Sequence, residues 1–127
     1  MAEGAHILVV EDNEKNMKLF RDVLHASGYR TLEAATGERA VELVFEHRPD
    51  LVLMDIQLPD IDGIEALSRL RADGRTSSVP VLALTAQAME GDRERFLAAG
   101  FDGYLSKPVN ITELLGAVKH HCAGAGR

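Results

Sequence analysis

Strand-like runs alternate with helix-like segments along almost the whole sequence, and this alternation restricts the fold more than any other feature. The strand-like runs lie at residues 6–10, 30–34, 50–54, 81–84 and 103–105. Helix-like segments lie between and after them, at residues 14–27, 37–47, 64–70, 88–98 and 111–122. Because each strand is followed by a helix, we predict an α/β fold with a five-stranded parallel sheet, doubly wound by helices on both faces.

The helix-like segments differ in how strongly their sequences specify them. The last one has the clearest amphipathic pattern, with one face predicted to hold Ile111, Leu114, Leu115, Val118 and Cys122. Thr36 is a suitable N-cap for the helix at 37–47, and Pro49 is expected to stop that helix. The segment at 88–98 shows only weak helical periodicity.

Length and composition limit the class of protein. The 127 residues fit one domain, expected to span 1–127 with a core at about 6–122 and a flexible tail at 123–127. The net charge of −6 argues against a nucleic-acid partner, because nucleic-acid-binding domains usually carry a basic face. No apolar run is long enough for a transmembrane helix, and the N-terminus lacks a secretory pattern. We therefore expect a cytoplasmic protein with no membrane partner.

Acidic side chains follow two of the predicted strands. Glu11 and Asp12 come directly after the run at 6–10, and Asp55 comes directly after the run at 50–54. In an open parallel sheet the carboxyl ends of neighbouring strands meet at one edge, where ligands bind. Three carboxylates crowded together are unfavourable unless a cation lies among them. Oxygen ligands of this kind suit Mg²⁺, so the sequence predicts a metal-assisted site in which Asp55 is a candidate nucleophile.

The order of these residues resembles a known family. Glu11-Asp12, Asp55, Thr85 and the pair Lys107-Pro108 each follow or end a predicted strand, and together they are similar to the characteristic set of response-regulator receiver domains. The resemblance covers about residues 6–122. It implies the flavodoxin-like, CheY-like strand order 2-1-3-4-5 and a cis Lys107-Pro108 peptide bond.

Three shorter stretches narrow the resemblance. Residues 11–20, 54–59 and 88–92 are similar to single-domain receivers of the DivK type, which favours a stand-alone receiver. Receivers fused to hybrid histidine kinases share much of the same pattern. In both cases the resemblance implies a signalling switch in a two-component system or phosphorelay, without enzymatic activity toward other substrates.

The resemblance also implies a role for each site residue. Asp55 would accept a phosphoryl group from a histidine kinase or a histidine phosphotransfer protein. Asp12 and Asp55 would hold Mg²⁺, with Glu11 acting largely through water and Gln57 contributing its backbone carbonyl.

Further residues would bind the phosphoryl group and transmit the signal. The Lys107 ammonium, the Thr85 hydroxyl and the Ala86 backbone N–H would contact its oxygens. Movement of Thr85 would let Tyr104 rotate inward and reshape the surface formed by the fourth helix, fifth strand and fifth helix, which a downstream protein would read. The expected assembly is a monomer or a weak dimer.

Two alternative functions remain open at this point. A phosphatase or phosphotransferase of the haloacid-dehalogenase type also uses an Asp nucleophile, but it usually carries a second Asp where this sequence has Gln57. A binding module that works unphosphorylated would leave the acidic pair and Lys107 unexplained. Asp60 and Asp62 are expected to serve loop and helix-cap geometry rather than metal binding.

Overall fold

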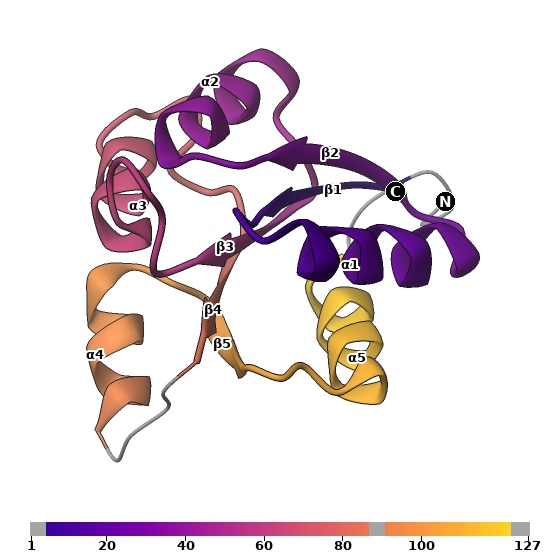
Figure 1. The fold of residues 1–127 in the computed structure, drawn as a ribbon. Helices are drawn as coiled ribbons and strands as arrows, with labels where there is room; N and C mark the ends of the chain where they lie inside the picture. Colours follow the sequence, from indigo (N-terminus) through magenta and orange to yellow (C-terminus); the bar gives the residue numbers. More distant parts are fainter. Residues whose placement is uncertain (1–4, 87–90, 123–127) are drawn as a thin grey trace.

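The sheet and its helices follow one another in strict alternation in the computed structural model, which describes residues 5–86 and 91–122 (Figure 1). The strands are β1 (His6–Val10), β2 (Arg30–Ala34), β3 (Leu51–Asp55), β4 (Val81–Thr85) and β5 (Gly103–Ser106). The helices are α1 (Glu14–Ala26), α2 (Gly37–His47), α3 (Gly63–Arg71), α4 (Asp92–Ala99) and α5 (Ile111–His121). The alternation predicted from the sequence is therefore confirmed.

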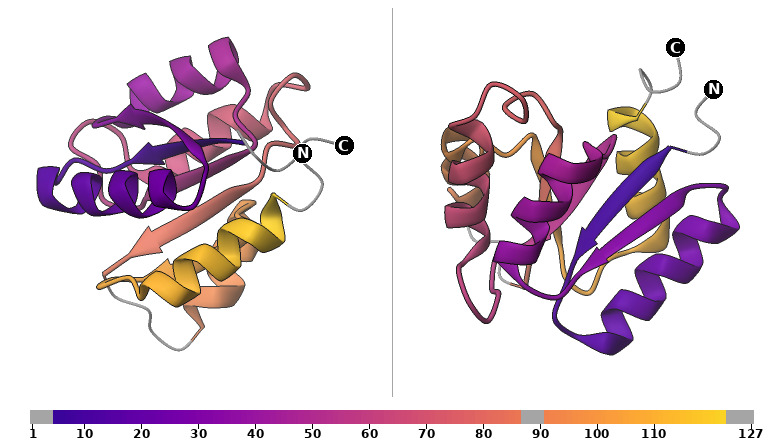
Figure 2. Two further views of the ribbon diagram at one scale, coloured as in Figure 1. Left: turned by 90° about the vertical axis from the view of Figure 1, so that its right-hand side faces the viewer. Right: turned by 90° about the horizontal axis from the view of Figure 1, so that it is seen from above.

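The strands form one parallel sheet in the order β2-β1-β3-β4-β5, as the resemblance implied. The register aligns the strand ends, because Val10 pairs with Met54 and Thr85 pairs with Ser106. Helices α1 and α5 cover one face of the sheet, and α2, α3 and α4 cover the other (Figures 1 and 2). The carboxyl ends of β1, β3, β4 and β5 consequently meet at one edge, where the next residues of the chain leave the sheet.

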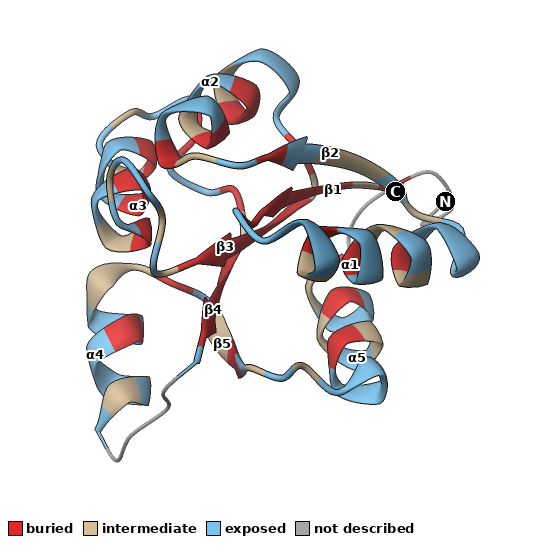
Figure 3. Cartoon of the chain, viewed as in Figure 1, coloured by how far each residue is buried: buried red, intermediate tan, exposed pale blue. Residues whose placement is uncertain are grey.

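Apolar side chains on both faces of the sheet hold these layers together. Every residue of β3 and β4 is buried, as expected for central strands covered by helices on both sides (Figure 3). Alternate residues go to opposite cores, so that Leu53 packs with α1 and α5 while Met54 packs with α2 and α3. Fully burying one such side chain stabilises a fold by about 1.5–3 kcal/mol.

Several predicted boundaries shift by one residue, and one apolar position was wrong. The third strand is Leu51–Asp55 rather than 50–54. Asp50 lies directly before it, where its carboxylate accepts the backbone N–H of His6 at 2.8 Å. In α5, Leu114 and Val118 are buried as predicted, but the side chain of Ile111 is 48% exposed. Ile111 is the first residue of α5, directly after the Asn110 N-cap, and the buried residues of the helix begin one turn later at Leu114.

The fourth helix differs most from its prediction. The predicted segment 88–98 includes 88–90, which lie outside the described residues, and the helix itself spans Asp92–Ala99. Its N-cap is Gly91, which has a backbone φ of 90°, a left-handed conformation that favours glycine. Within the described ranges, no helix has the length and apolar character needed to cross a membrane.

Candidate functional site

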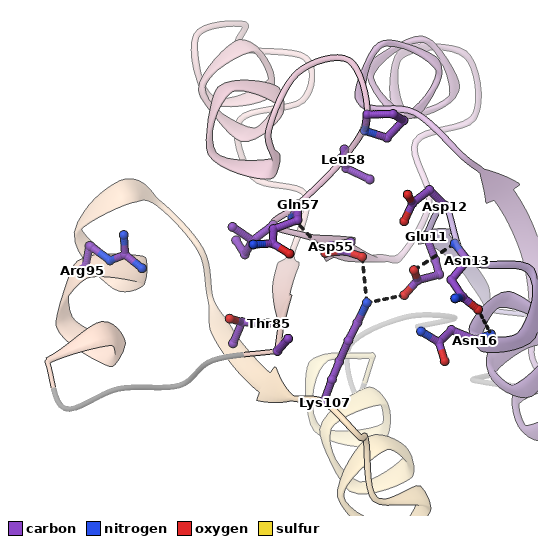
Figure 4. A pocket seen from close by; sticks show the side chains of 13 residues that line it. Glu11, Asp12, Asn13, Asn16, Asp55, Gln57, Leu58, Thr85, Arg95 and Lys107 are labelled. Carbon is purple, nitrogen blue, oxygen red and sulfur yellow. Dashed lines mark hydrogen bonds and ion pairs between the residues drawn. The ribbon is translucent and has the colours of Figure 1, made fainter.

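Five side chains converge where the strands end, and Figure 4 shows how they lie. Glu11 and Asp12 follow β1, Asp55 ends β3, Thr85 ends β4, and Lys107 follows β5. All five line one pocket of about 630 Å³. The sequence predicts that each of these residues follows or ends a strand, and the observed strand order brings them to the same edge of the sheet.

Lys107 bridges two of the acids. Its ammonium nitrogen Nζ lies 2.6 Å from Glu11 Oε1 and 2.7 Å from Asp55 Oδ2 (Figure 4). Burial alone would lower the pKa of Lys107, but hydrogen bonds and charge attraction from Asp55 and Glu11 outweigh burial and raise it. Lys107 is therefore a permanent cation at this site, and it is already directed toward Asp55.

Glu11 is the most deeply buried of the acids, with 2% of its surface exposed. Burial raises its pKa, although the hydrogen bonds from Lys107 and from the Asn13 backbone N–H act in the opposite direction. The Asn13 N–H lies 3.1 Å from Glu11 Oε2, so both oxygens of the carboxylate are engaged. Glu11 is thus held rigidly beside Asp55.

The carboxylates of Glu11, Asp12 and Asp55 have the arrangement that a cation needs. One oxygen from each lies within 4.8 Å of the others. Glu11 and Asp55 are buried, whereas Asp12 is exposed and borders the opening of the pocket. One Lys107 ammonium does not neutralise three carboxylates, and an all-oxygen donor set that is open to water on one side suits Mg²⁺, which usually retains several water ligands. The residues present therefore fit this ion.

The loop between β3 and α3, residues 56–62, is closely fitted to Asp55. The Gln57 backbone N–H donates to Asp55 Oδ1 at 2.9 Å, and the Gly63 N–H donates to the Ile56 carbonyl at 2.8 Å. A Cβ atom on Gly63 would lie only 2.5 Å from the Asp55 carbonyl oxygen. Glycine at position 63 is what permits the loop to return this close to the strand.

We expect Gly63→Ala to destabilise the protein by about 1–3 kcal/mol, because its methyl group forces the backbone of Asp55 and Ile56 to move. Urea unfolding measures this loss. Gly116→Ala is the matched control, since no atom lies within 4 Å of a Cβ at this exposed position in α5. That control should stabilise the protein by about 0.5–1 kcal/mol. Equal effects of the two substitutions would contradict the close approach at Gly63.

The remaining predicted residues lie around the same pocket or beside it. Thr85 is 8% exposed and Ala86 follows it on the pocket wall. Tyr104 is half-buried on β5, with its ring centroid 5.7 Å from that of Phe96 on α4. The Lys107-Pro108 bond is cis, as the resemblance implied.

Asn13 and Arg95 also line the pocket, although neither was among the predicted site residues. Asn13 caps α1 by accepting the N–H groups of Lys15 and Asn16, both at 3.0 Å, and also lines the pocket. Arg95 borders the pocket from α4, on the side opposite Asp12 (Figure 4). A cap can be recognised from sequence, but the position of Arg95 depends on how α4 packs, which its weak periodicity does not specify.

Comparison with known proteins agrees with this geometry. Residues 7–119 match the model of the response regulator receiver domain. The chain belongs to this family. It is 46% identical over 119 residues to the polar-differentiation response regulator DivK of Brucella anthropi, covering 94% of this chain and 97% of that relative.

Solved receiver structures have the same fold. The receiver domain of the sensor histidine kinase PA1611 from Pseudomonas aeruginosa PAO1 is 40% identical with a TM-score of 0.87, covering 94% of this chain and 98% of that one. That receiver has a magnesium ion coordinated in its active-site cleft. The receiver domain of the Francisella response regulator 1452 is 28% identical with a TM-score of 0.89, covering 95% of this chain and 98% of that one.

Proposed function

We propose that this receiver accepts a phosphoryl group on Asp55 from the phosphohistidine of a histidine kinase or a histidine phosphotransfer protein. The observation that carries the proposal is the contact of 2.7 Å between Lys107 Nζ and Asp55 Oδ2, inside a pocket that also holds Glu11 and Asp12. A carboxylate beside a fixed cation is arranged to receive an anionic group whose charge must be neutralised.

In the proposed reaction an Asp55 carboxylate oxygen attacks phosphorus, the N–P bond of the phosphohistidine breaks, and its electron pair stays on the imidazole. Mg²⁺, held by Asp12, Asp55 and the Gln57 carbonyl with Glu11 nearby, would neutralise charge on the phosphoryl oxygens. Lys107 leaves its contact with Asp55 Oδ2 for a phosphoryl oxygen, at little cost because both partners are anionic. Positioning and charge neutralisation supply the catalysis, so no further acid or base is required.

Phosphorylation would then change the surface at α4, β5 and α5. The Thr85 hydroxyl and the Ala86 N–H are adjacent to the site and would bind the remaining phosphoryl oxygens. Thr85 ends β4, which pairs with β5, and Tyr104 lies on β5 against Phe96 of α4. Displacement of Thr85 is thus passed to the Tyr104 ring through two neighbouring strands, and a downstream protein would bind the altered surface.

We propose a signalling switch without enzymatic output of its own, because the relative that this chain matches over 97% of that relative's length is a response regulator. A haloacid-dehalogenase type of hydrolase fits less well, because position 57 holds Gln, which has no proton to donate as an acid. The proposed cellular location is the cytoplasm, where histidine kinases present their phosphorylated domains.

The test is phosphorylation of the purified protein by acetyl phosphate, with and without Mg²⁺. We expect one phosphoryl group per chain in the presence of Mg²⁺ and almost none after chelation. The single positive charge of Lys107 does not balance the negative charges of Glu11, Asp12 and Asp55. Intact mass measures uptake, and release by hydroxylamine identifies an acyl phosphate. If the folded protein is phosphorylated neither by acetyl phosphate nor by any of a panel of phosphorylated histidine kinases, the proposed function is wrong.

A further inference from the structure

Asp60 connects the loop 56–62 to a different element, the N-terminus of α2. Its two carboxylate oxygens accept the backbone N–H groups of Gly37 at 2.8 Å and Glu38 at 2.9 Å. The first N–H groups of a helix have no partner within the helix, and the helix dipole favours an anion there. Desolvation alone would raise the pKa of Asp60, but these backbone donors lower it to about 2. Asp60 is therefore ionised at neutral pH.

A second contact joins the same two segments. A Cβ atom on Gly37 would lie 2.5 Å from Ile61 Cγ1 and 3.1 Å from the Ile61 carbonyl oxygen. The loop thus packs directly on the first backbone turn of α2, and glycine at position 37 leaves the space that it needs. The hydrogen bonds that Asp60 accepts and the packing of Ile61 therefore involve consecutive residues of the loop.

The helix has a further cap besides Asp60. Thr36 is the N-cap of α2, and its hydroxyl accepts the Arg39 N–H at 3.1 Å. In the loop, Ile56, Leu58 and Ile61 are partly buried against the core, whereas Gln57, Pro59 and Asp60 are exposed, so the hydrogen bonds accepted by Asp60 hold the exposed part. Removing Asp60 should therefore loosen the loop more than it weakens the helix.

We propose that Asp60 is a positioning residue that fixes the loop 56–62 against α2 and so holds the Gln57 backbone, whose N–H donates to Asp55 Oδ1, at the acidic pocket. This inference rests on the proposed function in one respect, that the Gln57 carbonyl is a ligand of Mg²⁺. Outer residues that orient metal ligands usually change metal affinity about 10–100-fold when they are replaced. Asp60 acts through backbone that is exposed, so the lower end of that range is expected.

The experiment compares Asp60→Ala with two controls in the full chain. Thr36→Ala removes a cap of α2 without touching the loop, and Glu38→Gln removes one exposed negative charge close to Asp60. Amide NMR gives two readouts: the Mg²⁺ dissociation constant, from titration shifts, and hydrogen exchange of the Gln57 and Gly63 amides in metal-free protein. We expect about tenfold weaker Mg²⁺ binding and faster exchange at both amides in Asp60→Ala alone.

The outcomes separate this inference from the proposed function. Unchanged exchange at Gln57 and Gly63 in Asp60→Ala would overturn the positioning role, whatever the metal affinity. A loss of Mg²⁺ affinity in Glu38→Gln equal to that in Asp60→Ala would overturn it as well, because the effect would be one of net charge. If the wild-type protein bound no Mg²⁺, the proposed function would fail, while the exchange rates would still decide whether Asp60 orders the loop.

Discussion

Replacing Asp55 with Asn should abolish phosphoryl uptake while leaving the protein folded. The amide is not a nucleophile toward phosphorus, and it removes one of the three carboxylates available to Mg²⁺. The fold should survive because an Asn oxygen can still accept the Gln57 N–H, which donates to Asp55 Oδ1 at 2.9 Å. Intact mass after incubation with Mg²⁺ and acetyl phosphate measures uptake, and circular dichroism reports the fold.

Asp62→Asn is the matched control for this experiment. It makes the same acid-to-amide change in the same loop, where Asp62 caps α3 by accepting the Glu65 N–H at 2.7 Å. Asn is about as good an N-cap as Asp, so stability and phosphoryl uptake should both be retained. Uptake that persisted in Asp55→Asn, at Asp12 or another acid, would place the phosphoacceptor elsewhere and contradict the assignment.

The central part of this site was predictable because it depends only on where the strands end and on their order in the sheet. Glu11, Asp12, Asp55 and Lys107 each follow or end a strand-like run, and a parallel sheet brings those ends to one edge. The prediction needed the strand order, which periodicity does not contain and which came from the family resemblance. The direct contact of Lys107 with both Glu11 and Asp55 could not be predicted, because it depends on side-chain rotamers in the folded pocket.

Contacts between elements that are distant in sequence were the ones that sequence patterns missed. Arg71 at the end of α3 donates hydrogen bonds to the carbonyls of Ser77, Val79 and Gly100 and to the Asp102 carboxylate. Nothing in the spacing of these residues identifies such a cluster. Asp60 is a related case: its role in loop and cap geometry was expected, but its partner helix, α2, was not.

The weak periodicity of α4 has a physical reason in the structure. Phe96 is the only fully buried residue of Asp92–Ala99, so the helix presents one large side chain to the core instead of a stripe. The Phe96 ring packs edge-on against Phe101, with centroids 6.0 Å apart, and tilted against Tyr104 at 5.7 Å. A helix that is held through one buried side chain is easier to displace than a helix that buries a whole face. This fits the proposal that the surface at α4 changes on phosphorylation.

Phe96→Ala should therefore reduce the free energy of unfolding by about 3–5 kcal/mol, the usual loss for a fully buried phenylalanine. Leu97→Ala is the control on the same helix; Leu97 is 42% exposed, and a change of about 0.5 kcal/mol or less is expected. Urea unfolding gives both values, and hydrogen exchange should show α4 opening in Phe96→Ala while β3 stays protected. Equal stabilities of the two variants would mean that the packing of Phe96 does not hold α4 on the core. The proposed transmission of the change at Thr85 through Tyr104 to α4 would then have no structural support.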